Sequence, residues 1–583
     1  MFERFRQKID IGFKPWHQHA LIFLLLVLLY GPTVFYKYTY FDDYTLIVQD
    51  AGFITNIGNL LRIFSTDVFR ADTIAYRPLL VLSLMIDAQI GGISPWIFHL
   101  GNILIHMVSA LLLLALLRKI SCPRPLSLIL TLFFLVHPAL VQAVAWIPGR
   151  NDSLLGSFIL ISLLALVNFG YSRSWGWFGL HILALLAALF TKEAALVFPA
   201  VAVFCLFSPI FRTLGRLRFY LLGASWVIIV GCWFILRSLV VASRAAHGAM
   251  VLNTPGENLQ GILGYIGKML LPFNLSVIPT PTFNMVVYGT IVMLCVVIVV
   301  CKWGVKDQAI FATGLAMIGL FLLPHLLRGT QFANYLEHRL YLSLLGFILS
   351  ASQLKAMDMI DWRKKAAWVT ASVILFAYAT LSVIRLPIYY DQFSLLLNLI
   401  EKRPGLALSY QHMGYIFTES GEFNKAQLYY NKALELEPAN KDIFHSLGVV
   451  YESQRQWQKA EQSFLRGLEL APRSSSLRYN LAYLYHQTGR AKEAERQYKL
   501  AIISRPENTK AQLNLGMLYH QQGSLQKAER QYRRVLEIEA TTPEAWYNLG
   551  IIFRQRGMID SSRPYIERAV QLKPELKDIN KSF

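Results

Sequence analysis

Long apolar runs fill the first 400 residues of the chain and are separated by short polar connections. A helix needs about 20 predominantly apolar residues to cross a bilayer. Runs that approach this length lie at 19–37, 96–117, 125–147, 153–171, 175–190, 194–211, 219–241, 285–301, 308–327, 340–354 and 366–385. The sequence therefore predicts an all-α fold that begins with a multi-pass membrane bundle of about eleven spans.

Charge density divides the chain into two segments. Residues 1–400 carry 45 Lys, Arg, Asp and Glu side chains, and the much shorter segment 401–583 carries 47. About a quarter of the residues in an ordinary soluble domain are charged, and only the second segment reaches that density. We therefore expect a membrane domain at 1–400 and a soluble domain at 401–583, which excludes a disordered chain or a single soluble domain.

The basic residues of the membrane segment predict its orientation. If the N-terminus is cytoplasmic and the loops alternate, short cytoplasmic loops hold 17 of the 29 Lys and Arg residues of this segment. Positively charged loops stay in the cytoplasm. We therefore expect a protein of the bacterial inner membrane whose N-terminus is cytoplasmic and whose soluble domain is periplasmic, with the equivalent lumen as the alternative location of that domain.

Two of the predicted outer loops, 38–95 and 242–284, are long. Each contains an apolar stretch that is too short to span comfortably, at 79–90 and at 262–271. We interpret these stretches as helices on the outer membrane surface, and an additional hairpin of two spans is the alternative.

A period of 34 residues runs through the soluble domain, over about 405–575. The recurring positions are Gly414, Gly448, Ala482, Gly516 and Gly550; Ala426, Ala460, Ala494, Ala528 and Ser562; Tyr430, Phe464, Tyr498, Tyr532 and Ile566; and Pro438, Pro472, Pro506 and Pro574, with Ala540 departing from the proline series. Small residues let paired helices approach, the aromatic ring fills the space between them, and proline ends the second helix. The pattern resembles five tetratricopeptide repeats, which stack into a superhelix with a concave groove. Binding of a protein segment is the favoured role of such a groove, and a purely structural scaffold is the alternative.

Asp42 and Asp43 follow the first apolar run and are predicted to lie just outside the membrane. Adjacent carboxylates repel each other, and partial desolvation raises the pKa of at least one of them. Such a pair suits a general base or, alternatively, the ligands of a divalent metal ion. An ordinary acidic loop explains the position equally well.

Further charged and polar side chains are predicted to reach the same outer face. They are Arg77, Arg150, Asp152, Lys192, Glu193, Glu337, His338, Arg339 and Tyr341. Arg and Lys are the natural ligands of a phosphate, so the group predicts a binding site for a lipid phosphate or pyrophosphate. Each residue alone also fits a snorkelling side chain or a local ion pair, and Lys192 with Glu193 fits such a pair best.

Four polar side chains fall inside predicted spans. His99, Asn102 and His106 share one face of the second run, and His137 lies in the third. They suit a metal or a polar substrate, but hydrogen bonds between helices are the more common role. A Walker lysine, a nucleophile elbow, an HExxH motif and a Rossmann fingerprint are all missing, so no nucleotide cofactor is expected.

The order of these motifs carries a family resemblance that covers nearly the whole chain. It resembles the transmembrane and tetratricopeptide-repeat O-mannosyltransferases and their bacterial relatives, which are GT-C glycosyltransferases. The motifs are Phe41-Asp42-Asp43, Tyr76-Arg77-Pro78-Leu79, Phe98-His99-Leu100 through Asn102 and His106, His137-Pro138, Val144-Ala145-Trp146, Gly149-Arg150-Asn151-Asp152, Lys192-Glu193 and Glu337-His338-Arg339-Leu340-Tyr341-Leu342.

The resemblance implies an enzyme that takes mannose or a similar hexose from a polyprenyl-phosphate carrier at the outer face. An acid in the first outer loop, matched here by Asp42, acts as a base toward an acceptor hydroxyl of Ser or Thr. The implied partners are the lipid-linked sugar, membrane lipid and an acceptor protein in the repeat groove, without nucleic acid. Gln142 stands where many relatives have an acid, which weakens any role for that position.

Two other functions use the same architecture. A non-enzymatic envelope assembly factor would recruit partners through the repeats, but an anchor needs one span rather than about eleven. A transporter for a lipid-linked sugar predicts ionisable residues near the bilayer midplane and an internal repeat between two halves. The ionisable residues here cluster at the outer ends of the spans, which favours the enzyme.

Overall fold

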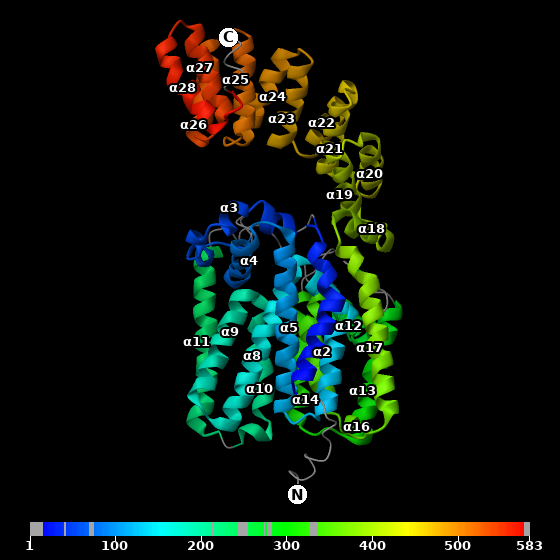
Figure 1. The fold of residues 1–583 in the computed structure, drawn as a ribbon. Coiled ribbons are helices and arrows are strands. Elements are labelled where there is room, and N and C mark those ends of the chain that lie inside the picture. Colours follow the sequence, from blue (N-terminus) through cyan, green and yellow to red (C-terminus); the bar gives the residue numbers. More distant parts are fainter. Residues whose placement is uncertain are drawn as a thin grey trace. The chain divides into compact units, whose positions relative to one another are not determined.

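The structure, a computed structural model, describes residues 15–39, 42–68, 75–212, 214–241, 255–272, 275–276, 283–326 and 336–576. Over these ranges the chain forms helices and connecting turns and no β-strand, so the predicted all-α class is confirmed (Figure 1). The contacts divide the chain into two compact units, Met1–Lys402 and Arg403–Phe583.

Each of the eleven apolar runs in the first unit overlaps a helix. The helices of this unit are α2 (Pro15–Tyr30), α3 (Ala51–Ile54), α4 (Pro78–Gly91), α5 (Pro95–Lys119), α6 (Arg124–Val136), α7 (Val141–Ala145), α8 (Arg150–Ser172), α9 (Trp175–Thr191), α10 (Phe198–Leu206), α11 (Arg216–Val241), α12 (Pro255–Leu270), α13 (Phe283–Trp303), α14 (Gln308–Leu326), α15 (Leu340–Ser352), α16 (Lys355–Asp358), α17 (Lys365–Arg385) and α18 (Gln392–Lys402). The two short outer stretches also form helices, α4 and α12. Their place on the membrane surface stays a prediction.

Six helices in the described part of the chain are long and apolar enough to cross a membrane, or seven if one bent pair is a single span. Four further apolar helices are shorter, including α4 and α9. The first unit is therefore a multi-pass membrane bundle, and the number of eleven spans stays a prediction.

The run at 125–147 is bent. α6 and the helical segment 138–145 meet at 47°, because Pro138 has no N–H to continue the helix. The ring Nδ1 of His137 accepts a hydrogen bond of 3.2 Å from the backbone N–H of Ala139 and caps the new segment. The bend lets the short helix α7 pack against α5, α8 and the turn at Glu337–Arg339.

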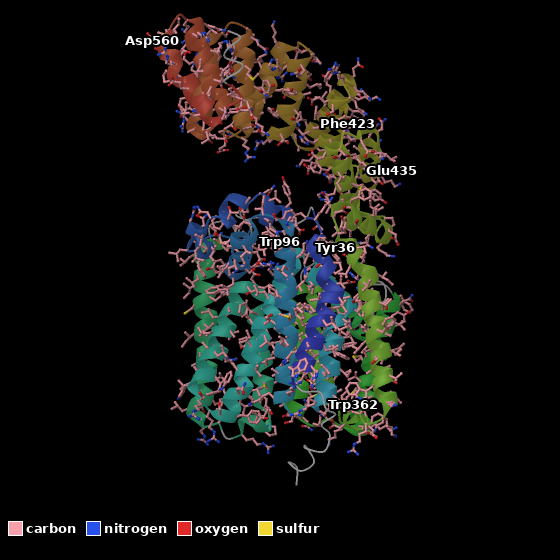
Figure 2. All side chains as sticks on the ribbon, in the orientation of Figure 1. Tyr36, Trp96, Trp362, Phe423, Glu435 and Asp560 are labelled. Carbon is pink, nitrogen blue, oxygen red and sulfur yellow. The ribbon has the colours of Figure 1, made fainter. Side chains whose placement is uncertain are left out.

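Aromatic side chains lie at both ends of the bundle. Tyr36 and Trp96 lie at one end, and Trp362 lies at the other (Figure 2). Amphipathic rings prefer the interface between hydrocarbon and water. Their positions fit a bundle whose long helices cross the bilayer between these two levels.

The second unit consists of helix pairs with the predicted period. The helices are α19 (Ala407–Glu419), α20 (Phe423–Leu436), α21 (Lys441–Ser453), α22 (Trp457–Leu470), α23 (Ser475–Gln487), α24 (Ala491–Ser504), α25 (Thr509–Gln521), α26 (Leu525–Ile538), α27 (Pro543–Gln555) and α28 (Ile559–Leu572). The small residues let the paired helices approach as expected. A Cβ added at Gly448, for example, would lie 2.3 Å from the Phe464 ring.

Candidate functional site

The two carboxylates of the acidic pair have different surroundings. Asp43 is 1% exposed, and its Oδ2 accepts hydrogen bonds from the backbone N–H and the Oγ1 hydroxyl of Thr39, each at 2.8 Å. The indole Nε1 of Trp146 donates to the same hydroxyl at 2.9 Å. Asp42 is exposed. The pair therefore contains one fixed carboxylate and one that a substrate can reach.

The surroundings raise the pKa of both carboxyl groups. Burial raises the pKa of Asp43 to about 7, although the Thr39 hydrogen bonds act in the opposite direction and the nearby Asp42 adds to the rise. Loss of hydration next to the protein also raises the pKa of Asp42, and the positive charge of Arg77 partly offsets this rise. A reachable carboxylate with a raised pKa suits a general base.

A second group of charges is centred on Asp152, at the start of α8. Nζ of Lys192 lies 2.8 Å from both carboxylate oxygens of Asp152, and both side chains are almost fully buried. Nε2 of His338 lies 3.6 Å from Oδ2 of the same carboxylate. Burial lowers the pKa of His338 to about 3, although Asp152 acts in the opposite direction, so the ring is neutral near pH 7.

Arg77 and Arg339 complete the cationic group. Nε of Arg77 donates to Oε2 of Glu193 at 3.1 Å, and Oε1 of Glu193 accepts from the backbone N–H of Tyr76 at 3.0 Å. Burial is the main cause that lowers the pKa of Lys192. The charge of Asp152 raises this pKa, and the charges of Arg77 and Arg339 lower it further. Both arginines therefore lie within electrostatic range of the buried Lys192.

Two residues connect the acidic pair with this cationic group. Trp146 donates to the Thr39 hydroxyl that holds Asp43, and its ring centroid lies 5.7 Å from that of His338. Arg77 lies near Asp42 and also acts on Lys192. The structure thus gathers Asp42, Asp43, Arg77, Asp152, Lys192, Glu193, His338 and Arg339 into one region, and we refer to these eight residues as the outer cluster. Phe41 of the first motif lies outside the described residues.

Glu337 faces away from the outer cluster. Its Oε1 accepts hydrogen bonds of 2.9 Å from Nζ of Lys268 and from the backbone N–H of Ser276, and its Oε2 forms an ion pair with Arg385. Lys268 and Arg385 come from α12 and α17, and the sequence analysis missed both. An ionisable residue beside an apolar helix is the signal that points to them.

Gln142 positions the turn that carries His338. Its Oε1 accepts hydrogen bonds from the backbone N–H groups of Glu337, at 2.9 Å, and His338, at 3.1 Å. An acid was expected at this position from the resemblance. The fully buried amide oxygen of Gln142 makes both contacts without bringing another charge into the site.

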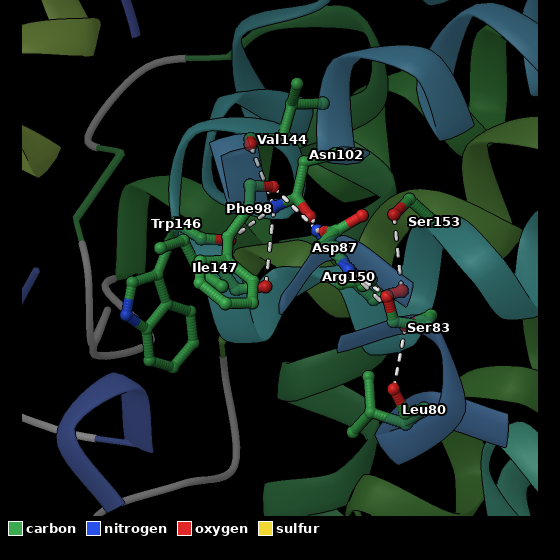
Figure 3. A network of polar contacts seen from close by, with 10 residues as sticks. All are labelled: Leu80, Ser83, Asp87, Phe98, Asn102, Val144, Trp146, Ile147, Arg150 and Ser153. Carbon is green, nitrogen blue, oxygen red and sulfur yellow. Dashed lines mark hydrogen bonds and ion pairs between the residues drawn. The ribbon is translucent and has the colours of Figure 1, made fainter. Parts of the chain in front are cut away.

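Arg150, a predicted phosphate ligand, has protein partners at each guanidinium nitrogen. Nε donates to Oδ1 of Asn102 at 2.7 Å, Nη2 donates to the Phe98 carbonyl at 2.6 Å and pairs with Asp87, and Nη1 donates to the Ser83 carbonyl at 3.2 Å (Figure 3). Nδ2 of Asn102 in turn donates to carbonyl oxygens of residues 144, 146 and 147. This network fixes the segment that carries Trp146.

The other polar residues of the spans contact neighbouring helices. Nδ1 of His106 lies 2.9 Å from the Tyr341 hydroxyl, and both side chains are fully buried. Nε2 of His137 lies 3.0 Å from the carbonyl oxygen of Met269. The buried His99 packs edge-to-face against Tyr36, with ring centroids 6.1 Å apart. Contacts of this kind are those that helices in a bundle make with one another.

Metal coordination needs several ligands around one point. Among the described residues, no three His, Cys, Asp or Glu side chains are arranged so that they could hold a metal ion. Asp42 and Asp43 are the two carboxylates that the sequence offers for such a role.

Comparisons with known proteins show the repeats directly. A family model described as TPR repeat matches residues 414–455 and 516–557. Two further models described as tetratricopeptide repeat match residues 447–508 and 543–576. The predicted repeat family of the second unit is confirmed.

Curated relatives carry the name protein O-mannosyl-transferase. TMTC2 of Mus musculus is 34% identical over 139 residues, which cover 23% of this chain and 17% of that protein. Tmtc1 of Drosophila melanogaster is 30% identical over 179 residues, covering 30% of this chain and 21% of that protein. TMTC3 of Mus musculus is 23% identical over 433 residues, covering 62% of this chain and 44% of that protein.

The match to TMTC3 is longer than the repeat unit, so it includes part of the membrane unit. The resemblance to this family that the motifs predicted is therefore confirmed. The chain spans less than half the length of each of these relatives.

Solved structures are similar to about a third of the chain or less. YrrB, described as a TPR protein with an unusual peptide-binding site, is 22% identical with a TM-score of 0.27, covering 32% of this chain and 98% of that chain. MamA is 22% identical with a TM-score of 0.26, covering 28% of this chain and 96% of that chain.

Proposed function

We propose that this chain is a membrane glycosyltransferase of the GT-C type that moves a hexose, such as mannose, from a polyprenyl-phosphate carrier to a hydroxyl group. The acceptor is Ser or Thr of an envelope protein that the repeats hold. The resemblance to protein O-mannosyl-transferases supports sugar transfer to a protein. The proposal further specifies a polyprenyl-phosphate carrier and inversion of configuration at the anomeric carbon of the sugar.

The outer cluster is the observation that carries the proposal. Its residues come from segments far apart in the sequence, yet Asp42, a carboxylate with a raised pKa, lies near Arg77. Arg77 and Arg339 in turn lie within electrostatic range of Lys192. A sugar transferase that uses a phosphate leaving group needs this combination of a base and fixed cations. A protein that serves only as an anchor has no use for it.

In the proposed reaction Asp42 accepts the proton of the incoming hydroxyl group. The hydroxyl oxygen bonds to the anomeric carbon from the face opposite the phosphate, and the bond from that carbon to the phosphate oxygen breaks. The electron pair of that bond leaves with the phosphate, whose negative charge therefore grows. Arg339, Arg77 and Lys192 stabilise this charge. Their stabilisation is strongest in a site that is shielded from water.

Several residues position these groups in the proposal. Asp152 fixes the Lys192 ammonium by accepting two hydrogen bonds. Asp43, held by Thr39, keeps a second carboxylate beside Asp42, and the charge of Asp42 helps to keep the pKa of Asp43 raised. Gln142 holds the turn that leads to Arg339. A divalent metal, if the reaction uses one, would be held by the two aspartates and would neutralise phosphate charge.

The proposed setting is the bacterial inner membrane. The N-terminus is cytoplasmic, and the outer cluster and the repeats are periplasmic, as the distribution of basic residues supports. The domain at 1–400 performs the transfer, and the repeat domain at 401–583 holds the acceptor. The lipid tail of the donor lies among the apolar helices.

Mass spectrometry of envelope proteins tests the function. Cells with and without the chain are compared, and cells that express Asp42→Asn serve as the third sample. A hexose-sized adduct on Ser or Thr that depends on both the chain and Asp42 supports the proposal. An unchanged pattern of adducts in all three samples would refute it and favour a scaffold.

A further inference from the structure

The first helices of successive repeats line one face of the second unit. α19 packs against α21, α21 against α23, and α23 against α25. In a repeat superhelix, the helices that contact one another from repeat to repeat line the concave side. Side chains at the C-terminal end of α21 and in the middle of α23 are therefore candidates for contact with a protein segment bound on this side.

Glu452, near the end of α21, is an unusual carboxylate in this unit. Neighbouring Lys or Arg side chains form ion pairs with most other acidic side chains of the repeats, for example Lys432 with Glu435 and Arg490 with Glu461. Glu452 is half-buried, and within the described residues it has neither an ion pair nor a side-chain hydrogen bond. A half-buried carboxylate without a cation loses hydration, and no ion pair compensates for this loss.

Tyrosine side chains of the next repeat lie near this carboxylate. On α23, Tyr479 and Tyr483 stack with ring centroids 6.4 Å apart, and Tyr498 of α24 lies 6.2 Å from Tyr479. Burial raises the pKa of Tyr479 and Tyr498, and the charge of Glu452 raises them further. The carboxylate therefore lies within electrostatic range of both hydroxyl groups.

The tyrosines also keep hydrogen-bonding capacity. The Tyr479 hydroxyl accepts a hydrogen bond of 3.0 Å from Nδ2 of Asn514. Tyr498 is fully buried, and the side-chain amide of Asn514 also acts on its hydroxyl group. The group thus combines a negative charge, the negative faces of aromatic rings and hydroxyl oxygens that are able to accept hydrogen bonds.

We propose that Glu452, Tyr479 and Tyr483 form a binding site for the cationic side chain of a Lys or Arg residue in an extended protein segment. The ammonium or guanidinium group supplies the counter-charge that Glu452 lacks, and aromatic faces attract cations through their quadrupoles. The site extends the proposed function by giving the repeats a chemical preference for acceptor segments with a basic residue. The binding site itself does not depend on the proposed glycosyltransferase function. Only the role of the bound segment as a sugar acceptor rests on that function.

The protonation of Glu452 agrees with this proposal. Burial raises the pKa of its carboxyl group to about 7, and no neighbouring cation opposes the shift. A bound cation favours the ionised form. The carboxylate is therefore one whose charge a basic ligand stabilises.

Binding of synthetic peptides to the full chain in nanodiscs tests the site without any sugar transfer. Fluorescently labelled Ser/Thr-rich peptides carry one central Lys, Arg, acetyl-lysine or norleucine, and anisotropy gives each dissociation constant. The variants are Glu452→Gln, Tyr483→Leu and Tyr483→Phe. Glu507→Gln, which removes an exposed charge between α24 and α25, is the matched control. Melting curves establish that each variant is folded.

We expect the wild type and Glu507→Gln to bind the Lys and Arg peptides about fivefold to tenfold more tightly than the neutral peptides. Glu452→Gln and Tyr483→Leu should lose most of this preference, whereas Tyr483→Phe should keep it because the ring remains. Equal binding of all peptides by the wild type, no binding of any peptide, or an unchanged preference in Glu452→Gln would overturn the proposal. Because no donor is present, any of these results leaves the glycosyltransferase proposal to its own test.

Discussion

The buried pair of Lys192 and Asp152 makes a quantitative prediction about stability. The side chains are 7% and 3% exposed, and both carboxylate oxygens lie 2.8 Å from Nζ. Asp152→Leu leaves the ammonium buried without its counter-charge. Removal of one partner from a buried ion pair costs about 3–5 kcal/mol.

The ability of Lys192 to lose its proton sets an upper limit on this cost. Deprotonation of a lysine at pH 7 costs about 4–5 kcal/mol, from about 1.4 kcal/mol for each pH unit below its ordinary pKa near 10.4. This limit agrees with the range for a broken pair. In the variant the folded state holds fewer protons than the unfolded state, so stability rises with pH. The deficit relative to the wild type should therefore be larger at pH 6 than at pH 9.

Melting curves in detergent, followed by tryptophan fluorescence at pH 6, 7.5 and 9, measure the effect. Asp358→Leu is the control in the same unit, because its partner Lys306 is part-exposed and such pairs contribute about 0–1 kcal/mol. The double variant Asp152→Leu with Lys192→Met should regain most of the lost stability but not sugar transfer. If Asp152→Leu melts like the wild type, or if its deficit is the same at pH 6 and pH 9, the buried pair is not charged as described.

Three further predictions follow from the membrane topology, the cationic group and the repeats. A reporter that is active only in the cytoplasm should be silent when fused after Phe583, and strong activity would reverse the orientation. Arg339→Ala should lose most of the transfer rate and Arg339→Lys should lose less, since Lys keeps the charge without the planar fork; wild-type turnover in both would remove Arg339 from the mechanism. Gly448→Leu should lower the melting temperature of the repeats, because even a Cβ there would lie 2.3 Å from the Phe464 ring, whereas an unchanged melting curve would contradict the close packing.

The sequence predicted the elements of the fold because their signals are local. Apolar length marks the membrane helices, and the 34-residue period marks the repeats. The bend at Pro138 was missed, although proline is a local signal, because the apolar run continues across it. Hydropathy alone does not distinguish a straight span from two short helices.

The sequence grouped the residues of the candidate site but did not give the direction in which each side chain points. The structure brings Asp152, Lys192 and His338 together, whereas Glu337 faces the opposite side of its turn toward Lys268 and Arg385. Adjacent residues of a tight turn point in different directions, and sequence spacing does not give the partner of each. The contacts of Thr39 with Asp43 and of Trp146 with Thr39 were missed because sequence spacing does not show them either.

Asp42 provides the most direct test of the proposed mechanism. Purified wild type, Asp42→Asn and Asp43→Asn are given a polyprenyl-phosphate-linked hexose and a Ser/Thr acceptor, and the initial rate of transfer is measured beside donor binding. Loss of a general base typically lowers the rate by about 10²–10⁴-fold. Asp42→Asn should bind the donor like the wild type and transfer almost no sugar, and Asp43→Asn should be affected less. Wild-type transfer by Asp42→Asn would contradict the account.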